Sequence, residues 1–121
     1  MLQNSFYTVL RAESSPGNVK ALLSINKEHP ILKGHFPGQP VVPGVCMMQI
    51  IKELTEQQTK NKLNISRADT IKFLSIIDPR LNPEVEALVS YIEKDGSFSV
   101  TASLMAGEVT FFKLKATLDN A

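Results

Sequence analysis

The sequence predicts an α+β fold in which an antiparallel sheet of five to six strands wraps around one long central helix. Only one stretch free of Pro and Gly, residues 45–60, has the length and apolar periodicity of such a helix. The segments on either side of it combine β-forming residues with turn signals. Because one helix must then cover the whole sheet, and 121 residues suit one core, we expect a single domain over residues 1–121.

Two strands are expected before the helix. Residues 6–10 form a short β-prone run, and the Ser-Ser-Pro-Gly-Asn sequence at residues 14–18 is a turn cluster. Residues 19–25 then alternate, which places Val19, Ala21, Leu23 and Ile25 on one face of a strand.

A proline-rich segment separates these strands from the helix. Four prolines and three glycines lie between His29 and Gly44, and this density predicts a long, stiff loop without regular structure. Pro43 suits the entry to the helix that follows. The first two turns of that helix are apolar nearly all round, as in a buried helix. Further along, a polar face is expected from Gln49, Lys52, Glu53 and Glu56.

Four strands are expected after the helix. Residues 71–77 are rich in β-forming side chains, and residues 84–91 alternate between apolar and polar. Asp95-Gly96 is a strong hairpin signal, and the strict alternation of residues 97–104 indicates an antiparallel strand with one wet face. Residues 109–118 form the last expected strand.

Composition excludes several classes of protein. Lys and Arg number 13 against 12 Asp and Glu, a net charge of +1, which offers no broad electrostatic footprint for nucleic acid. A single Cys excludes an internal disulfide framework and a Cys-rich zinc site. No apolar stretch approaches the roughly 20 residues of a membrane span, and the first residues lack the features of a signal peptide. We therefore expect a cytoplasmic protein without a membrane span.

His35 and the start of the helix are the first candidates for chemistry. A rigid loop can hold the His35 imidazole in place, and an imidazole exchanges protons near neutral pH. The loop leads into a helix N-terminus at Gly44-Val45, whose free N–H groups can bind an oxyanion. The alternative is that His35 is an ordinary surface or backbone-bonding residue. Gln49 either belongs to the polar face of the helix or faces a ligand, and Cys46 is expected to be a core thiol.

Residues 34–45, Gly-His-Phe-Pro-Gly-Gln-Pro-Val-Val-Pro-Gly-Val, resemble the signature of the β-hydroxyacyl-acyl-carrier-protein dehydratases, the FabA/FabZ family. The resemblance implies the hotdog fold and an active site between two subunits, in a homodimer or a trimer of dimers. It implies a 3-hydroxyacyl substrate carried by acyl carrier protein or coenzyme A, with no metal or organic cofactor. It makes His35 catalytic and implies substrate contacts from Phe36, Pro37, Gly38, Pro43, Gly44 and Val45.

The chain departs from this family at its second catalytic position. The family commonly has a carboxylate where this chain has Gln49, and often Gln four residues later, where this chain has Glu53. Because an amide cannot protonate the leaving hydroxide, three alternatives are open. His35 can shuttle the proton, Glu53 can supply a compensating acid from about 6 Å further along the helix axis, or the chain has left dehydration. In the last case it is a hotdog thioesterase or an inactive subunit that binds an acyl chain or a partner.

Overall fold

The computed structural model of the chain describes residues 1–35 and 40–121, and for residues 34 and 35 it describes the backbone alone. The described parts hold two helices and six strands. In chain order these elements are β1 (Tyr7–Ser15), β2 (Asn18–Ile25), α1 (Pro30–His35), α2 (Gly44–Thr59), β3 (Leu63–Phe73), β4 (Glu84–Lys94), β5 (Ser97–Ala106) and β6 (Val109–Asn120).

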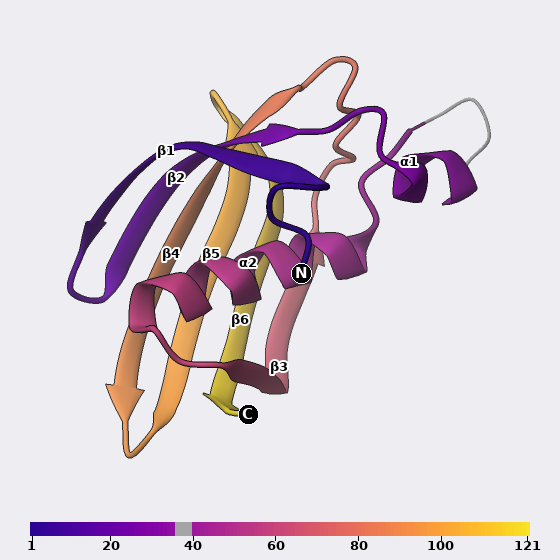
Figure 1. The fold of residues 1–121 in the computed structure, drawn as a ribbon. Coiled ribbons are helices and arrows are strands. Elements are labelled where there is room, and N and C mark those ends of the chain that lie inside the picture. The colour runs from indigo at the N-terminus through magenta and orange to yellow at the C-terminus, as the bar shows by residue number, and fades with distance from the viewer. Residues whose placement is uncertain (36–39) are drawn as a thin grey trace.

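The six strands form one antiparallel sheet in the order β1-β2-β4-β5-β6-β3. The sheet curves around α2, which lies along its concave face (Figure 1). This is the hotdog fold, and the expected sheet wrapped around a central helix is confirmed. The strands β1 and β3 are the two edges of the sheet.

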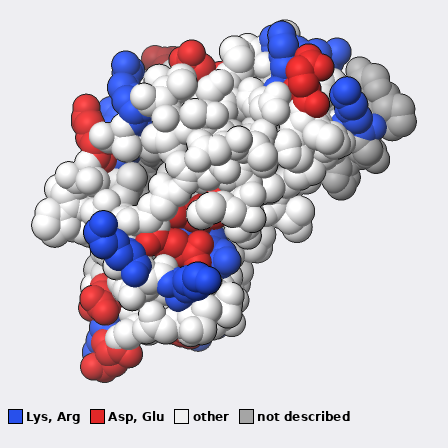
Figure 2. All heavy atoms as spheres, viewed as in Figure 1, with Lys and Arg blue, Asp and Glu red and all other residues white. Residues whose placement is uncertain are grey.

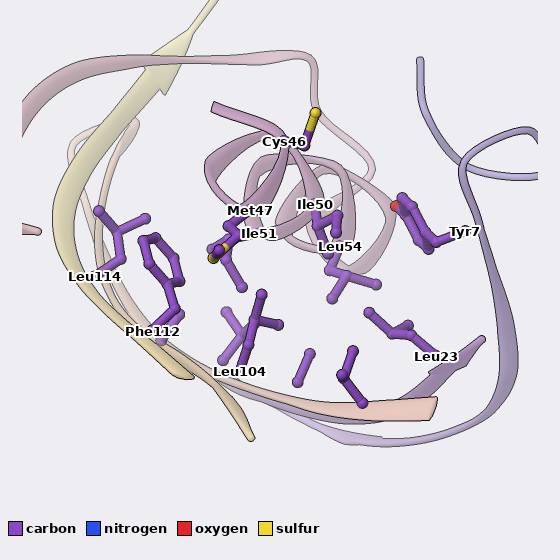
Figure 3. Packing of buried hydrophobic residues seen from close by; sticks show 14 of the residues in the cluster. Tyr7, Leu23, Cys46, Met47, Ile50, Ile51, Leu54, Leu104, Phe112 and Leu114 are labelled. Carbon is purple, nitrogen blue, oxygen red and sulfur yellow. The ribbon is translucent and has the colours of Figure 1, made fainter. Parts of the chain in front are cut away.

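The hydrophobic core lies between α2 and the inner face of the sheet. Ile50, Ile51 and Leu54 of α2 are at most 3% exposed. They face side chains from strands across the width of the sheet, among them Leu23, Leu104 and Phe112 (Figure 3). The packing accounts for the apolar start of the helix, because burial of each such side chain contributes about 1.5–3 kcal/mol.

The proline-rich segment is not wholly irregular, and our prediction for it was wrong at its beginning. The six-residue helix α1 starts at Pro30. Proline suits the first turn of a helix, since its missing N–H is one that would have no partner there. The His29 ring also accepts a hydrogen bond from the backbone N–H of Ile31 through Nδ1, at 3.1 Å. The remaining three prolines follow after α1 ends.

The strand β3 lies earlier in the chain than expected. It begins at Leu63 and ends at Phe73, where we predicted a strand over residues 71–77. The polar residues early in β3 hid it from a hydrophobic pattern, but pairing with β6 satisfies their backbone groups. Two register shifts interrupt this pairing, and residues 74–77 leave the sheet edge.

Basic and acidic side chains are interspersed on the face seen in Figure 2, around a broad uncharged area. That distribution agrees with the net charge of +1. Within residues 1–35 and 40–121, neither helix has the length and hydropathy needed to cross a bilayer.

Candidate active site

The N-terminus of α2 has two backbone donors available. Pro43 precedes the helix in an extended conformation, with φ −65° and ψ 148°, and makes no side-chain cap. Its carbonyl accepts from the N–H groups of Cys46 at 3.0 Å and Met47 at 3.2 Å. Within the described part of the chain, nothing accepts from the N–H groups of Gly44 and Val45. These donors sit at the positive end of the helix dipole, where an anion or oxyanion is stabilised.

An apolar cavity of about 430 Å³ lies beside these donors. One wall is the helix entry, residues 41–44 with Met47, and the other is the segment that leaves β3, residues 73–76. The Phe73 ring lies against Gly44 so closely that a Cβ on residue 44 would come within 2.6 Å of Phe73 Cζ. Because its lining is mostly apolar, the cavity can hold an apolar chain next to the helix N-terminus.

Gln49 and Glu53 are joined one turn apart on α2. The Gln49 Nε2 donates a hydrogen bond to Glu53 Oε2 at 2.7 Å. Glu53 also accepts from the backbone N–H groups of Leu2, at 2.8 Å, and Gln3, at 2.9 Å. The Tyr7 hydroxyl donates a further bond to Glu53 Oε1 at 3.0 Å. Glu53 is only 1% exposed, which corrects its expected place on a solvated polar face.

These four donors govern the ionisation of Glu53. Burial by itself raises the pKa of the Glu53 carboxyl, but the hydrogen bonds from Leu2, Gln49, Gln3 and Tyr7 together outweigh it and hold that pKa below its ordinary value. Burial and the neighbouring Glu53 charge raise the pKa of the Tyr7 hydroxyl, so Tyr7 stays a neutral donor. Glu53 is thus an ionised acceptor, which is the wrong state for giving a proton to a leaving group.

The structure brings together part of the predicted site. Pro43 and Gly44 line the cavity, Gln49 is half-buried one turn beyond, and the Val45 side chain is 73% exposed. His35 is the last residue of α1. Its side chain lies outside the described part, as do Phe36, Pro37 and Gly38 entirely.

Cys46 and His29 both pack within the fold, and neither lines the cavity. Cys46 is buried, as expected for a core thiol, and burial raises its pKa. The His29 ring packs edge-on against Phe6, with ring centroids 5.3 Å apart.

Two parts of the site were missed by sequence reasoning. One is the cavity wall formed by Phe73, Leu74 and Ile76: Phe73 does belong to a strand, as predicted, but Leu74 and Ile76 lie beyond its end, where we had expected the strand to continue. The run Phe-Leu-Ser-Ile-Ile ending at Asp78-Pro79 was the available signal, because its apolar side chains do not alternate. The other is the N-terminal segment that bonds to Glu53, for which the sequence carries no local signal.

A curved sheet around α2, with the open start of that helix beside an apolar cavity, places the chain among the hotdog-fold proteins of the dehydratase class. The family model described as ApeI dehydratase matches residues 11–110, and the chain belongs to this ApeI-like family.

Curated relatives of the chain are named as dehydratases. A 3-hydroxyacyl-[acyl-carrier-protein] dehydratase FabZ from Streptococcus pyogenes serotype M3 is 27% identical over 95 residues, covering 73% of this chain and 67% of the relative. The FabZ of Streptococcus uberis is 28% identical over the same length, covering 73% and 66%.

Solved structures share the fold. The dehydratase heterocomplex ApeI:P from Xenorhabdus doucetiae contains a chain that matches with a TM-score of 0.75 and 18% identity, over 93% of this chain and 96% of that one. A sigma28-regulated virulence protein from Campylobacter jejuni matches with a TM-score of 0.70 and 10% identity, over 97% and 85%.

Proposed function

We propose that this protein is a 3-hydroxyacyl-[acyl-carrier-protein] dehydratase, which removes water from a 3-hydroxyacyl thioester to give the trans-2-enoyl thioester. The observation that carries the proposal is the pair of N–H donors at Gly44 and Val45, which have no acceptor among the described residues and lie beside a cavity with apolar walls. Proton removal next to a thioester builds negative charge on the carbonyl oxygen, and such donors stabilise that charge. The cavity suits the acyl chain.

His35 is the proposed base. Its neutral imidazole takes a proton from the carbon next to the thioester carbonyl, and the electron pair left behind is delocalised onto the carbonyl oxygen. That pair forms the double bond between the second and third carbons as the bond from the third carbon to the hydroxyl oxygen breaks. The imidazolium then returns its proton to the departing hydroxide, so that one water leaves and His35 is neutral again.

We propose that His35 acts first as base and then as acid, because neither Gln49 nor Glu53 is suited to donate a proton. Gln49 can accept or donate a hydrogen bond but cannot transfer a proton. Glu53 is buried, ionised and engaged by four donors, so we do not assign it the role of the acid. We propose that Gln49 binds the substrate hydroxyl while His35 carries the proton.

We further propose that two subunits pair along β3, at the edge of the sheet. Around the end of this strand lie exposed apolar side chains, namely Ile71, Phe73, Leu74, Ile76 and Val45 at 39%, 57%, 54%, 62% and 73% exposure. An exposed apolar strand edge is ordinarily covered, and pairing with a second chain covers it. The same pairing encloses the cavity at the start of α2, since Phe73, Leu74 and Ile76 line both.

A second candidate is a subunit that binds an acyl chain or a catalytic partner without reacting. It is favoured by Gln49 in the position of an acid and by the commitment of Glu53 to the N-terminal segment. The solved ApeI:P structure is described as a dehydratase heterocomplex, which supports a partner that is a different chain.

Mass spectrometry of a carrier protein loaded with a 3-hydroxyacyl group distinguishes these proposals. The dehydratase predicts loss of one water from the carrier after incubation with the protein. Release of the free carrier thiol indicates a thioesterase instead. An unchanged mass, accompanied by a stable complex with the carrier or with a related dehydratase chain, supports the binding subunit and contradicts the dehydratase.

A further inference from the structure

Glu53 is a buried charge, and every donor that the described residues supply to it is neutral. It is 1% exposed, and its four donors are two backbone amides, a phenol and a side-chain amide. Among the described residues no Lys, Arg or His forms an ion pair with it. A buried carboxylate stays ionised only while such donors satisfy it, so each donor is fixed in direction by the charge.

That charge decides which way the Gln49 amide points. At 2.7 Å from Glu53 Oε2, the amide must present its Nε2. The flipped amide would set its Oε1 against an ionised carboxylate oxygen, and two acceptors without a proton between them repel. The Oε1 of Gln49 therefore points away from Glu53, on a side chain that remains half-exposed.

We propose that Glu53 is a positioning residue, which locks the Gln49 amide with its oxygen presented as a hydrogen-bond acceptor and ties Leu2, Gln3 and Tyr7 to the same point of α2. The assignment rests on the proposed function only where it names the ligand. An acceptor fixed in this way selects an acyl group that carries a hydroxyl donor at its third carbon over the same acyl group without one.

The contact itself is tested without any substrate, by NMR of the Gln49 side-chain amide. Glu53→Gln removes the charge that orients the amide, so the Gln49 Nε2 proton resonances should move and exchange faster with solvent. Glu56→Gln is the matched control, because it makes the same change one turn nearer the helix end. The carboxylate of Glu56 bonds to the Leu63 N–H, at 2.9 Å, and not to Gln49. Unmoved Gln49 resonances in Glu53→Gln would overturn the proposal.

A reciprocal exchange guards against a variant that simply fails to fold. Gln49→Glu places two carboxylates in contact and should lower the midpoint of thermal unfolding. Adding Glu53→Gln restores one donor and one acceptor across the same contact, so the double variant should recover much of the lost midpoint. A double variant no more stable than Gln49→Glu alone contradicts a direct coupling of the two side chains.

The orientation of the Gln49 amide by Glu53 is tested by the preference of the protein for an acyl group that carries the hydroxyl. The two probes are carrier proteins loaded with a 3-hydroxyacyl group and with the matching saturated acyl group, titrated by calorimetry onto His35→Ala so that no reaction follows. We expect roughly fivefold tighter binding of the hydroxyl form, the order of one net hydrogen bond. The ratio should fall toward one when Glu53→Gln is added and persist with Glu56→Gln. If the ratio of the two affinities is unchanged by Glu53→Gln, Glu53 does not position the Gln49 amide for the hydroxyl.

If neither acyl carrier protein binds, the proposed function is wrong. The NMR experiment then still tests the contact between Gln49 and Glu53.

Discussion

The Phe73 ring covers the first residue of α2, and only glycine at position 44 leaves room for it. A Cβ there would lie 2.6 Å from Phe73 Cζ and 2.7 Å from Phe73 Cε1. The ring is held on its other side by Phe112, with ring centroids 5.4 Å apart. The absence of a side chain at Gly44 therefore leaves room for the ring that forms one wall of the cavity.

Gly44→Ala should destabilise the protein and disturb the cavity. The added methyl group must displace the Phe73 ring or the helix entry, and because that ring is 57% exposed and can move outward, we expect a cost of about 1 kcal/mol, at the low end for overpacking. Urea denaturation measures the loss. In a Phe73→Ala background the obstacle is gone, so the same Gly44→Ala change should cost much less. Equal costs in the two backgrounds contradict the contact.

The buried carboxylate predicts a pH dependence of stability. Because the pKa of Glu53 is lowered in the folded protein, its contribution is complete above the unfolded value of about 4.3 and is lost as the pH falls through the folded value. The free energy of unfolding of Glu53→Gln should thus lie below that of the wild type near pH 7 by about 1–3 kcal/mol. The difference in the free energy of unfolding between the wild type and Glu53→Gln should become smaller as the pH is lowered below about 4.3. Glu93→Gln, on an exposed part of β4, should leave the pH profile of the wild type unchanged.

The proposed pairing of two subunits along β3 predicts that a charge placed at this edge disrupts the assembly. Ile76→Glu puts a carboxylate into the apolar surface beside Phe73 and should shift the protein toward monomers in sedimentation experiments. Ile92→Glu is the matched control, since Ile92 is 74% exposed on β4, where the surface is not part of the proposed interface. A sedimentation coefficient that does not respond to Ile76→Glu argues against this edge as the contact.

The sequence alone predicted the parts of the fold that rest on local pattern. The central helix was expected over residues 45–60 and spans Gly44–Thr59. The Asp95-Gly96 hairpin is present with φ of 53° and 80°, because both residues tolerate the left-handed region that this turn requires. The strict alternation of apolar and polar side chains over residues 97–104 likewise predicted the strand β5, which spans Ser97–Ala106.

Long-range pairing is what sequence reasoning could not supply. Glu53 lies among polar residues at helical spacing, a pattern that predicts a solvent-exposed side chain. It is buried instead, and Leu2 and Gln3, about fifty positions earlier in the chain, donate hydrogen bonds to it. The early part of β3 alternates only over residues 63–66 before a mostly polar run at residues 66–70 interrupts the pattern, and pairing with β6 continues the strand through that run. The departure at Gln49 and the presence of Glu53 four residues later on the helix were visible in the sequence, but the direction of the hydrogen bond between them depends on the burial of Glu53 among its other donors.

The most direct test of the account is water loss from a 3-hydroxyacyl carrier protein, followed by mass spectrometry, for the wild type, His35→Ala and His29→Asn. His29 serves as the control because it caps α1 and packs on Phe6, and asparagine keeps a capping acceptor. We expect the wild type and His29→Asn to form the enoyl product, and His35→Ala to lose at least about a hundredfold in rate. Equal water loss with and without the His35 imidazole would contradict the central claim.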